Sequence, residues 1–251
     1  MSMFDLTGRV ALVTGGNGGI GLGMALGLRD AGARVAIAGR NPDKARIALA
    51  ALGGDAVFIA ADMTKKADCV AMIAECLEKF GRLDILINNA GTTVRKPPQD
   101  LTEAEWHKVM DTNLSSAFFA SQAAYPAMKA QGGGKIINIG SVLSVGGSPF
   151  SAAYASSKAG IMNLSKALAT SWAVDNIQVN AVLPGWIDTD LTVGARAEIE
   201  GLNEMVLART PAARWGAASD LAGVAVFLAS RGSDFVTGAA IPVDGGYLAR
   251  T

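Results

Sequence analysis

Three polar side chains, Ser141, Tyr154 and Lys158, have types and a spacing that suit acid–base chemistry at an oxygen atom. Tyr154 and Lys158 are four residues apart in a segment of helical composition, so they share one face of the expected helix. Ser141 ends the apolar run "IINIGS". Strand ends and the starts of the following helices meet at the ligand edge of an α/β sheet. A tyrosine–lysine pair alone indicates only an ordinary helix face. Because Ser141 is expected at the same edge of the sheet, a catalytic site is the better interpretation.

A tyrosine beside a lysine can both donate and accept a proton. Free tyrosine has a pKa of about 10, so it is mostly protonated and a poor base. A nearby cation stabilises the phenolate and lowers that pKa. Tyr154 can then protonate a carbonyl oxygen during reduction and deprotonate an alcohol during oxidation. The Ser141 hydroxyl can bind the same oxygen, so the set predicts interconversion of alcohol and carbonyl.

A glycine-rich loop at residues 13–21, "VTGGNGGIG", follows the first apolar run and opens a helical segment. The loop fits two phosphate-binding patterns, which place their glycines at 16, 18 and 21 or at 15, 19 and 21. Backbone N–H groups at a helix N-terminus bind phosphate, and glycine lets the backbone come close to it. The loop therefore predicts a dinucleotide site and leaves the choice between the two patterns open.

The elements that must position these residues alternate along the chain. Apolar runs of strand length lie at 9–14, 34–39, 56–61, 83–89, 135–140, 177–184 and 239–246. Helical stretches lie near 19–31, 42–52, 65–80, 102–130, 152–175 and 217–230. This alternation predicts a single doubly wound Rossmann-type α/β domain over residues 1–251, with about seven parallel strands and helices on both faces.

Two segments depart from that regular pattern. Pro126 falls late in the stretch 102–130, where we expect it to kink the helix. Residues 189–214 have a weaker pattern and follow a strand end. Because ligands bind beyond the carboxyl ends of the strands, we expect this segment to act as a lid over the site; an ordinary surface connection is the alternative.

The composition excludes several classes of protein. The 251 residues have a formal net charge of zero, which argues against a nucleic-acid partner. No signal peptide and no membrane-spanning run are visible, and no His/Cys cluster indicates a metal site. Cys69 and Cys76 are too far apart on one helix to pair, so we expect buried free thiols. A reducing cytoplasm fits these features.

Further motifs occur in a fixed order along the chain: "TGGNGGIG", "NNAG" at 88–91, Asn113 in "VMDTNLSSAF", Ser141 in "IINIGS", "YASSK" at 154–158, "LPGWIDT" at 183–189 and "VTGAAIPVDGGY" at 236–247. Together they resemble the short-chain dehydrogenase/reductase family over nearly the whole chain. Each motif alone is weak, but their order and spacing are specific. The resemblance selects the pattern with Gly15, Gly19 and Gly21.

The resemblance implies a role for each catalytic candidate. Tyr154 would be the acid/base, Ser141 would bind the substrate oxygen, and Lys158 would bind the ribose and tune Tyr154. Asn113 would hold a water in a proton relay to Lys158. All four residues are present, which argues against a non-catalytic, nucleotide-sensing Rossmann protein. Family members are usually tetramers, so we expect a homotetramer.

The second strand bears on the choice of nicotinamide cofactor. It ends in "VAIAGRN", so Gly39 and Arg40 stand where an acid would bind the ribose 2′-OH of NAD. An arginine can instead bind a 2′-phosphate, which favours NADP(H), with NAD(H) as the alternative. Many NADP-preferring relatives carry a second basic residue in the glycine loop, where this chain has Asn17 and Gly18. Arg40 could also stack on adenine.

The resemblance also implies a set of contacts with small molecules. The expected cofactor contacts are Gly15, Asn17, Gly19, Ile20, Gly21, Arg40, Asp62, Met63, Asn89, Ala90, Gly91, Tyr154, Lys158, Pro184, Gly185, Ile187 and Thr189. The expected substrate contacts are Ser141, Leu143, Tyr154, Trp186 and Arg95, the last being either an anion partner or a solvated loop residue. The resemblance is closest to family members that act on sugar acids, such as the gluconate dehydrogenases, and members that reduce 3-oxoacyl groups look nearly as similar. The small-molecule substrate, either a sugar acid or polyol or a 3-oxoacyl group or apolar ketone, is therefore left open.

Overall fold

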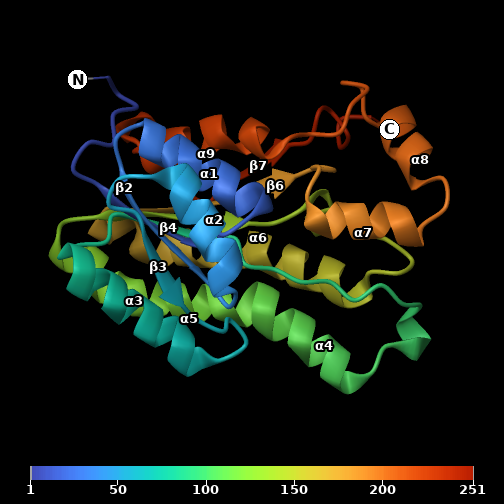
Figure 1. Ribbon diagram of the computed structural model, residues 1–251, viewed down its shortest axis with the longest axis horizontal. Helices are drawn as coiled ribbons and strands as arrows, with labels where there is room; N and C mark the ends of the chain where they lie inside the picture. The colour runs from blue at the N-terminus through green and yellow to red at the C-terminus, as the bar shows by residue number, and fades with distance from the viewer. Residues whose placement is uncertain (1, 251) are drawn as a thin grey trace.

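The computed structural model describes residues 2–250, in which one parallel sheet is covered by helices on both faces (Figure 1). Its strands are β1 (Val10–Thr14), β2 (Arg34–Gly39), β3 (Val57–Ala60), β4 (Ile85–Asn88), β5 (Gly134–Ile139), β6 (Ile177–Pro184) and β7 (Ala240–Val243). They lie in the order β3-β2-β1-β4-β5-β6-β7, and every neighbouring pair is parallel. The predicted seven-stranded doubly wound fold is confirmed.

The helices divide between the two faces of the sheet. They are α1 (Gly19–Asp30), α2 (Pro42–Leu52), α3 (Lys66–Phe80), α4 (Glu103–Met110), α5 (Ser116–Ala130), α6 (Ala152–Trp172), α7 (Asp190–Glu198), α8 (Leu202–Arg209) and α9 (Ala222–Ala229). Helices α3, α5 and α6 pack on one face, and α1, α2 and α9 on the other. None of the helices within residues 2–250 combines the length and apolarity needed to cross a membrane.

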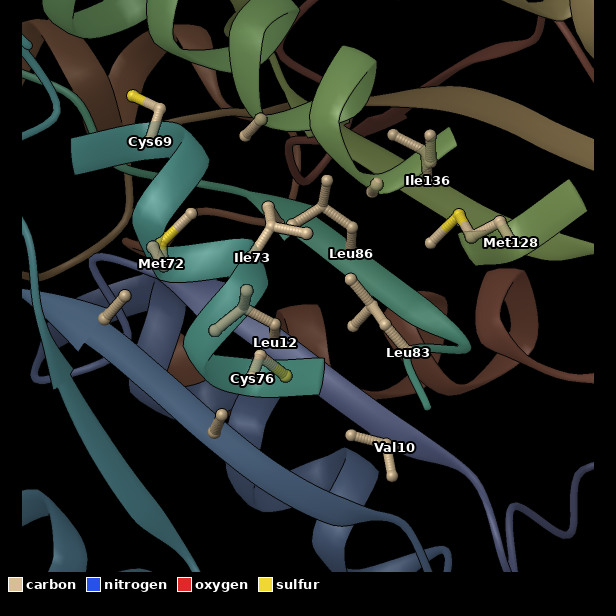
Figure 2. Packing of buried hydrophobic residues seen from close by; sticks show 14 of the residues in the cluster. Val10, Leu12, Cys69, Met72, Ile73, Cys76, Leu83, Leu86, Met128 and Ile136 are labelled. Carbon is tan, nitrogen blue, oxygen red and sulfur yellow. The ribbon is translucent and has the colours of Figure 1, made fainter. Parts of the chain in front are cut away.

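Strand residues alternate between two apolar layers, one on each face. Leu12 of β1 and Leu86 of β4 pack toward α3, while Val13 and Ile87 pack toward α1 and α9. Figure 2 shows the first layer, with Cys69, Met72, Ile73 and Cys76 of α3 above the strands. Burial on both faces explains the continuous apolar runs of these strands.

The two cysteines lie inside the first of these layers. Both are fully buried and unpaired, as expected from their spacing. Burial raises the pKa of Cys69 to about 11 and that of Cys76 to about 12. Because the thiolate is the reactive form, both side chains serve as small apolar packing groups.

The segment 102–130 does not form the single helix that we predicted. Helix α4 ends at Met110, a π-helical turn covers Asp111–Ser115, and α5 continues from Ser116. The irregularity therefore lies around Asn113, while Pro126 lies inside α5. Both polar atoms of the Asn113 side chain bond to the backbone of Thr92, at 2.8 and 2.9 Å. Such local bulges within helices occur frequently at functional sites.

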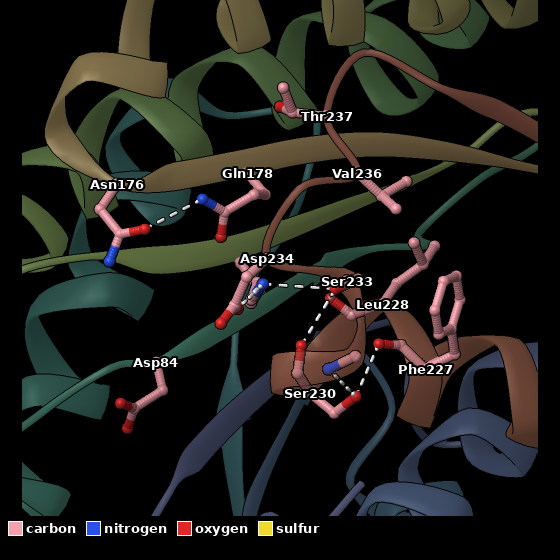
Figure 3. Close-up of polar contacts among 12 residues, drawn as sticks. Asp84, Asn176, Gln178, Phe227, Leu228, Ser230, Ser233, Asp234, Val236 and Thr237 are labelled. Atoms are coloured by element: carbon pink, nitrogen blue, oxygen red, sulfur yellow. Dashed lines mark hydrogen bonds and ion pairs between the residues drawn. The ribbon is translucent and has the colours of Figure 1, made fainter. Parts of the chain in front are cut away.

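Polar side chains gather at the amino edge of the sheet, and Figure 3 shows part of this group. Asp84 is 3% exposed and accepts hydrogen bonds from Arg9, Arg82 and the backbone of Val10. Lys135 of β5 donates to Asp234 at 2.8 Å. The Asp84 contacts join the beginnings of β1 and β4, and Lys135 ties the beginning of β5 to the turn after α9, at the edge opposite the catalytic candidates.

We predict that Asp84→Asn destabilises the fold by about 2 kcal/mol, less than a fully buried pair because both arginines are half-exposed. Burial alone would raise the pKa of Asp84, but hydrogen bonds from Arg82, Arg9 and Val10 lower it overall. Its stabilising contribution is therefore present above the ordinary pKa of 3.8 and is lost as pH falls through the lowered value. Urea unfolding at pH 7 and at pH 3 measures this, and an equal loss at both would contradict it.

Candidate active site

A cavity of about 370 Å³ opens at the carboxyl ends of the central strands. This is the edge at which open α/β sheets bind their ligands. The sheet and its crossovers bring together at this cavity predicted residues that are spread over 175 positions of sequence. Those lining it are Gly15, Asn17, Gly19, Ile20, Asn89, Ala90, Gly91, Arg95, Ser141, Leu143, Tyr154, Lys158, Pro184, Gly185, Trp186, Ile187 and Thr189.

The glycine loop shows which of its two patterns the backbone requires. Gly15 and Gly19 have φ values of +64° and +50°, which side chains rarely adopt. A Cβ on Gly21 would lie 2.4 Å from the carbonyl oxygen of Gly15. Gly18 is extended and has open space beside it. A Cβ on Gly16 would also clash, 2.6 Å from the Ile37 side chain, so the rival pattern fails only at Gly18. The positive φ values favour the pattern with Gly15, Gly19 and Gly21, and a loop so shaped at the start of α1 fits a dinucleotide phosphate.

Asn89 holds the glycine loop against the end of β4. Its side-chain amide donates to the carbonyl oxygens of Thr14 at 2.9 Å and Gly15 at 3.2 Å. The Thr14 hydroxyl in turn accepts from the backbone of Asn89 at 2.9 Å and of Ala90 at 3.0 Å. The loop and the floor of the cavity therefore form one hydrogen-bonded unit.

Lys158 lines the cavity, and Asn113 lies close behind it: a Cβ on Gly91 would be 3.6 Å from Lys158 Nζ and 3.5 Å from Asn113 Oδ1. The Lys158 side chain is 4% exposed, and its Nζ donates to the carbonyl oxygen of Ile139 at 2.7 Å. Its ammonium lies 5.7 Å from the centre of the Tyr154 ring. Asn113 does not line the cavity itself, but its amide donates to Ser157 at 3.0 Å. The structure thus joins α6 to the π-helical turn through Ser157, whose hydroxyl donates to the carbonyl oxygen of Tyr154.

Ser144 links the strand that carries Ser141 to the helix that carries Tyr154. Its hydroxyl donates to the carbonyl oxygen of Lys158 at 2.7 Å and accepts from the backbone of Ser141 at 3.1 Å. The hydroxyl of Ser141 accepts from the backbone of Leu143. Ser144 and Ser157 are not among the residues predicted from the sequence. The S-x-x-S spacing of a capping box was the local signal for Ser144.

Burial dominates the protonation of the two central groups. Burial raises the pKa of Tyr154, an effect that the Ser141 hydroxyl and the Arg95 charge partly oppose. Burial lowers the pKa of Lys158 to about 8. The sequence analysis expects Lys158 and an oxidised nicotinamide to lower the tyrosine pKa, but in this structure desolvation of the phenolate outweighs the Ser141 hydrogen bond and the Arg95 charge. Tyr154 is therefore held as a protonated phenol, ready to donate.

Two ion pairs tie α7 across the mouth of the cavity. Arg95 donates to Glu198 at 3.0 Å and to the carbonyl oxygen of Leu191 at 3.2 Å. Lys44, at the start of α2, contacts Asp190 at 2.6 Å. Arg95 is therefore paired, rather than a solvated loop residue. Its guanidinium remains in the cavity lining.

Four predicted cofactor residues lie outside the cavity lining. Gly21 packs beneath the glycine loop. Arg40 is exposed just beyond β2, next to the Asp62 carboxylate, whose pKa it helps to lower after the larger effect of Thr64. Met63 is buried beyond β3. Among residues 2–250, no group of three or more His, Cys, Asp and Glu side chains is placed to hold a metal ion.

Comparison with known proteins places this geometry in a family. Residues 15–248 match the sequence family described as enoyl-(acyl carrier protein) reductase. The chain is 45% identical to 2-dehydro-3-deoxy-D-gluconate 5-dehydrogenase of Escherichia coli K12, covering 100% of this chain and 99% of that protein.

Solved structures agree with the sequence matches. A putative short-chain alcohol dehydrogenase from Sinorhizobium meliloti 1021 superposes with a TM-score of 0.96, at 42% identity over 100% of both chains. A gluconate 5-dehydrogenase from Burkholderia cenocepacia J2315, solved with NADP and tartrate, gives 0.94 at 40% identity, covering 99% of this chain and 98% of that one. The chain belongs to the short-chain dehydrogenase/reductase family. The predicted class of enzyme, an oxidoreductase acting on alcohols and ketones, is confirmed.

We predict that Ser144→Ala lowers kcat about tenfold with little change in KM, because small misplacements of reacting groups are costly. The substitution removes the link between the Ser141 backbone and the Lys158 carbonyl. Steady-state kinetics measure it, with Ser156→Ala on the exposed side of α6 as the matched control. Equal effects of the two substitutions would contradict a positioning role for Ser144.

Proposed function

We propose that this enzyme is an NADP(H)-dependent dehydrogenase that interconverts a secondary alcohol and a ketone on a sugar acid. The observation that carries the proposal is the convergence of Ser141, Tyr154 and the cation of Arg95 on one cavity. The hydroxyl groups suit an alcohol or carbonyl oxygen, and the guanidinium suits a carboxylate on the same molecule. Relatives named for 2-dehydro-3-deoxy-D-gluconate and gluconate support the same substrate class.

The catalytic steps belong to four side chains. When bound, the nicotinamide supplies or accepts the hydride. Tyr154 donates its phenolic proton to the carbonyl oxygen during reduction and takes it back during oxidation. Ser141 donates a hydrogen bond to the same oxygen. The Lys158 ammonium stabilises the resulting phenolate and binds the ribose, and Asn113 holds a water that returns a proton toward Lys158.

The cofactor would lie along the carboxyl ends of β1, β2 and β4. The glycine loop and the start of α1 would hold the pyrophosphate, and Arg40 the 2′-phosphate. Solved relatives that contain NADP support this choice of cofactor. The remaining contacts would be Asp62 and Met63 at the adenine, Asn89, Ala90 and Gly91 along the floor, and Pro184, Gly185, Ile187 and Thr189 around the nicotinamide.

The substrate would occupy the part of the cavity under α7. Leu143 and Trp186 would flank it, and Arg95 would bind its carboxylate. Residues 189–214, which form α7 and α8, would act as a lid held by the Arg95 and Lys44 ion pairs. The buried indole N–H of Trp186 has no hydrogen-bond partner among residues 2–250. A polar substrate or a shift of the lid would supply one.

A second candidate substrate is a 3-oxoacyl group or an apolar ketone. Exposed apolar side chains favour it: Leu191 lines the cavity, and Val145 and Phe150 are close in sequence to the lining residues Leu143 and Ser151. They would contact a chain longer than the cavity. The family description, enoyl-(acyl carrier protein) reductase, is consistent with an acyl substrate.

We also propose a cytoplasmic homotetramer. Trp106 of α4, Phe118 of α5 and Val174 beyond α6 are large apolar side chains that face solvent in one chain. A second copy of the chain would cover them, and light scattering at micromolar concentration tests the assembly. The buried free thiols support a reducing compartment.

Turnover on a split substrate panel, followed by nicotinamide absorbance, tests the proposed function. One half contains sugar acids and polyols, and the other contains 3-oxoacyl thioesters and apolar ketones. We expect turnover in the sugar-acid half and its near-complete loss in Tyr154→Phe, because phenylalanine has no proton to donate. Activity confined to the other half would reject sugar acids as the substrate class and favour 3-oxoacyl groups or apolar ketones. Near-normal turnover in Tyr154→Phe would sink the mechanism.

We expect Arg40→Ala to raise the Kd of NADPH about tenfold and to change that of NADH little. The reason is that a guanidinium bound to a phosphate is lost only for the phosphorylated cofactor. Titration of nicotinamide fluorescence measures both constants. Equal changes for the two cofactors would assign Arg40 to the adenine ring instead.

A further inference from the structure

Lys44 enters the expected cofactor groove from an element that the family motifs do not cover. It lies in the first turn of α2, beyond the N-cap Asn41. Its side chain lines the same cavity as Asn17 and Gly18 of the glycine loop. Many NADP-preferring relatives carry a basic residue in this part of the glycine loop, where this chain has Asn17 and Gly18. Lys44 thus brings a cation to a groove whose loop has none.

The partner of Lys44 lies on the opposite wall of the groove. Its Nζ contacts the carboxylate of Asp190 at 2.6 Å, although the two residues are 146 positions apart. Asp190 is the first residue of α7 and follows Thr189. A Cβ on Gly19 would lie 3.2 Å from the Thr189 side chain, so the two walls approach closely here. The Lys44–Asp190 pair therefore spans the groove above the start of α1, where phosphate would bind.

The pair can be exchanged at little cost. The Lys44 side chain is 55% exposed and that of Asp190 is 89% exposed. Exposed ion pairs contribute little to folding stability, because water solvates both charges well. A 2′-phosphate monoester carries close to two negative charges and has three terminal acceptor oxygens. The pyrophosphate bridge carries two charges in all, so either group presents more negative charge than one carboxylate. A dinucleotide phosphate in the groove would compete well for the Lys44 ammonium.

We propose that Lys44 binds a phosphate group of the dinucleotide and that Asp190 occupies it until the cofactor arrives. The inference rests on the proposed function, since it assumes that the groove takes a nicotinamide dinucleotide. Asp190 is then a competitor for Lys44 rather than a ligand. Cofactor binding would also release one of the two ion pairs that tie α7 across the mouth, while Arg95–Glu198 persists.

Two single substitutions distinguish two roles of the ion pair. In one, Asp190 competes with the cofactor phosphate for Lys44; in the other, the pair only stabilises the shape of the groove. Lys44→Gln should raise the Kd of NADPH about tenfold, because it removes a charge-assisted hydrogen bond to phosphate. Asp190→Asn should lower the Kd or leave it unchanged, because it frees Lys44. If the ion pair only braces the groove, both substitutions break it equally and weaken binding alike. A loss of affinity in Lys44→Gln without a loss in Asp190→Asn is therefore specific to the proposal.

The full-length protein is titrated with NADPH and with NADH, without substrate, and binding is followed by nicotinamide fluorescence. Lys79→Gln is the matched control, since this half-exposed lysine pairs with Glu75 on α3, away from the cavity. If Lys44→Gln raises the Kd of both cofactors, Lys44 binds the pyrophosphate, which both contain. If it raises the Kd of NADPH alone, Lys44 binds the 2′-phosphate. Either result supports the proposal.

Three outcomes overturn it. The first is an effect of Lys44→Gln no larger than that of the control, and the second is a parallel loss of affinity in Lys44→Gln and Asp190→Asn. In both cases the wild-type protein still binds nicotinamide, so the proposed function stands while the role of Lys44 falls. The third is a wild-type protein that binds neither nicotinamide, which rejects the proposed cofactor site together with this inference.

Discussion

A buried ammonium that has no carboxylate partner among residues 2–250 is the constraint on which the site depends. Lys158 is nearly inaccessible, and its Nζ bonds to the carbonyl oxygen at the end of β5. Burying a charge costs free energy unless its surroundings compensate. Three surroundings compensate the Lys158 charge: the Ile139 carbonyl oxygen at the end of β5, the Tyr154 ring, and the cavity that the lysine lines. Helix α6 must therefore start beside β5, and that position determines where Tyr154 can be.

A second buried polar network fixes the strands behind the site. The Asn88 amide donates to Asn138 at 2.8 Å and to Ser121 at 3.0 Å, and Asn138 donates to Ser165 at 2.9 Å. These side chains connect β4 and β5 to α5 and α6. A fully satisfied polar network in a core specifies one arrangement of its elements, because any other would leave groups unpaired. These core positions hold polar rather than apolar side chains, and the network thereby fixes the register of β4 against β5 at the floor of the cavity.

The residue types at the site were more predictable than the contacts that hold them. The glycine loop, the strand ends and the tyrosine–lysine spacing are local patterns, and the parallel topology brings them to one edge. The π-helical turn at Asn113 has no local signal, and the side chain of Asn113 bonds to Thr92, which lies 21 residues earlier. The pairing of Lys44 with Asp190 likewise has no local signal. The raised tyrosine pKa depends on burial, which a sequence does not display.

The π-helical turn between α4 and α5 also constrains how this segment can change in length. Helix α4 packs against α6, whereas α5 packs against α3. An α-helix rotates by about 100° per residue, so one extra residue in the turn sets the angular phase between the two halves. Removing that residue would restore a regular helix and swing the apolar face of α5 away from α3. The segment can accept exchange of exposed side chains. A single-residue deletion, in contrast, could not keep both the packing of α5 on α3 and the position of Asn113 at the site.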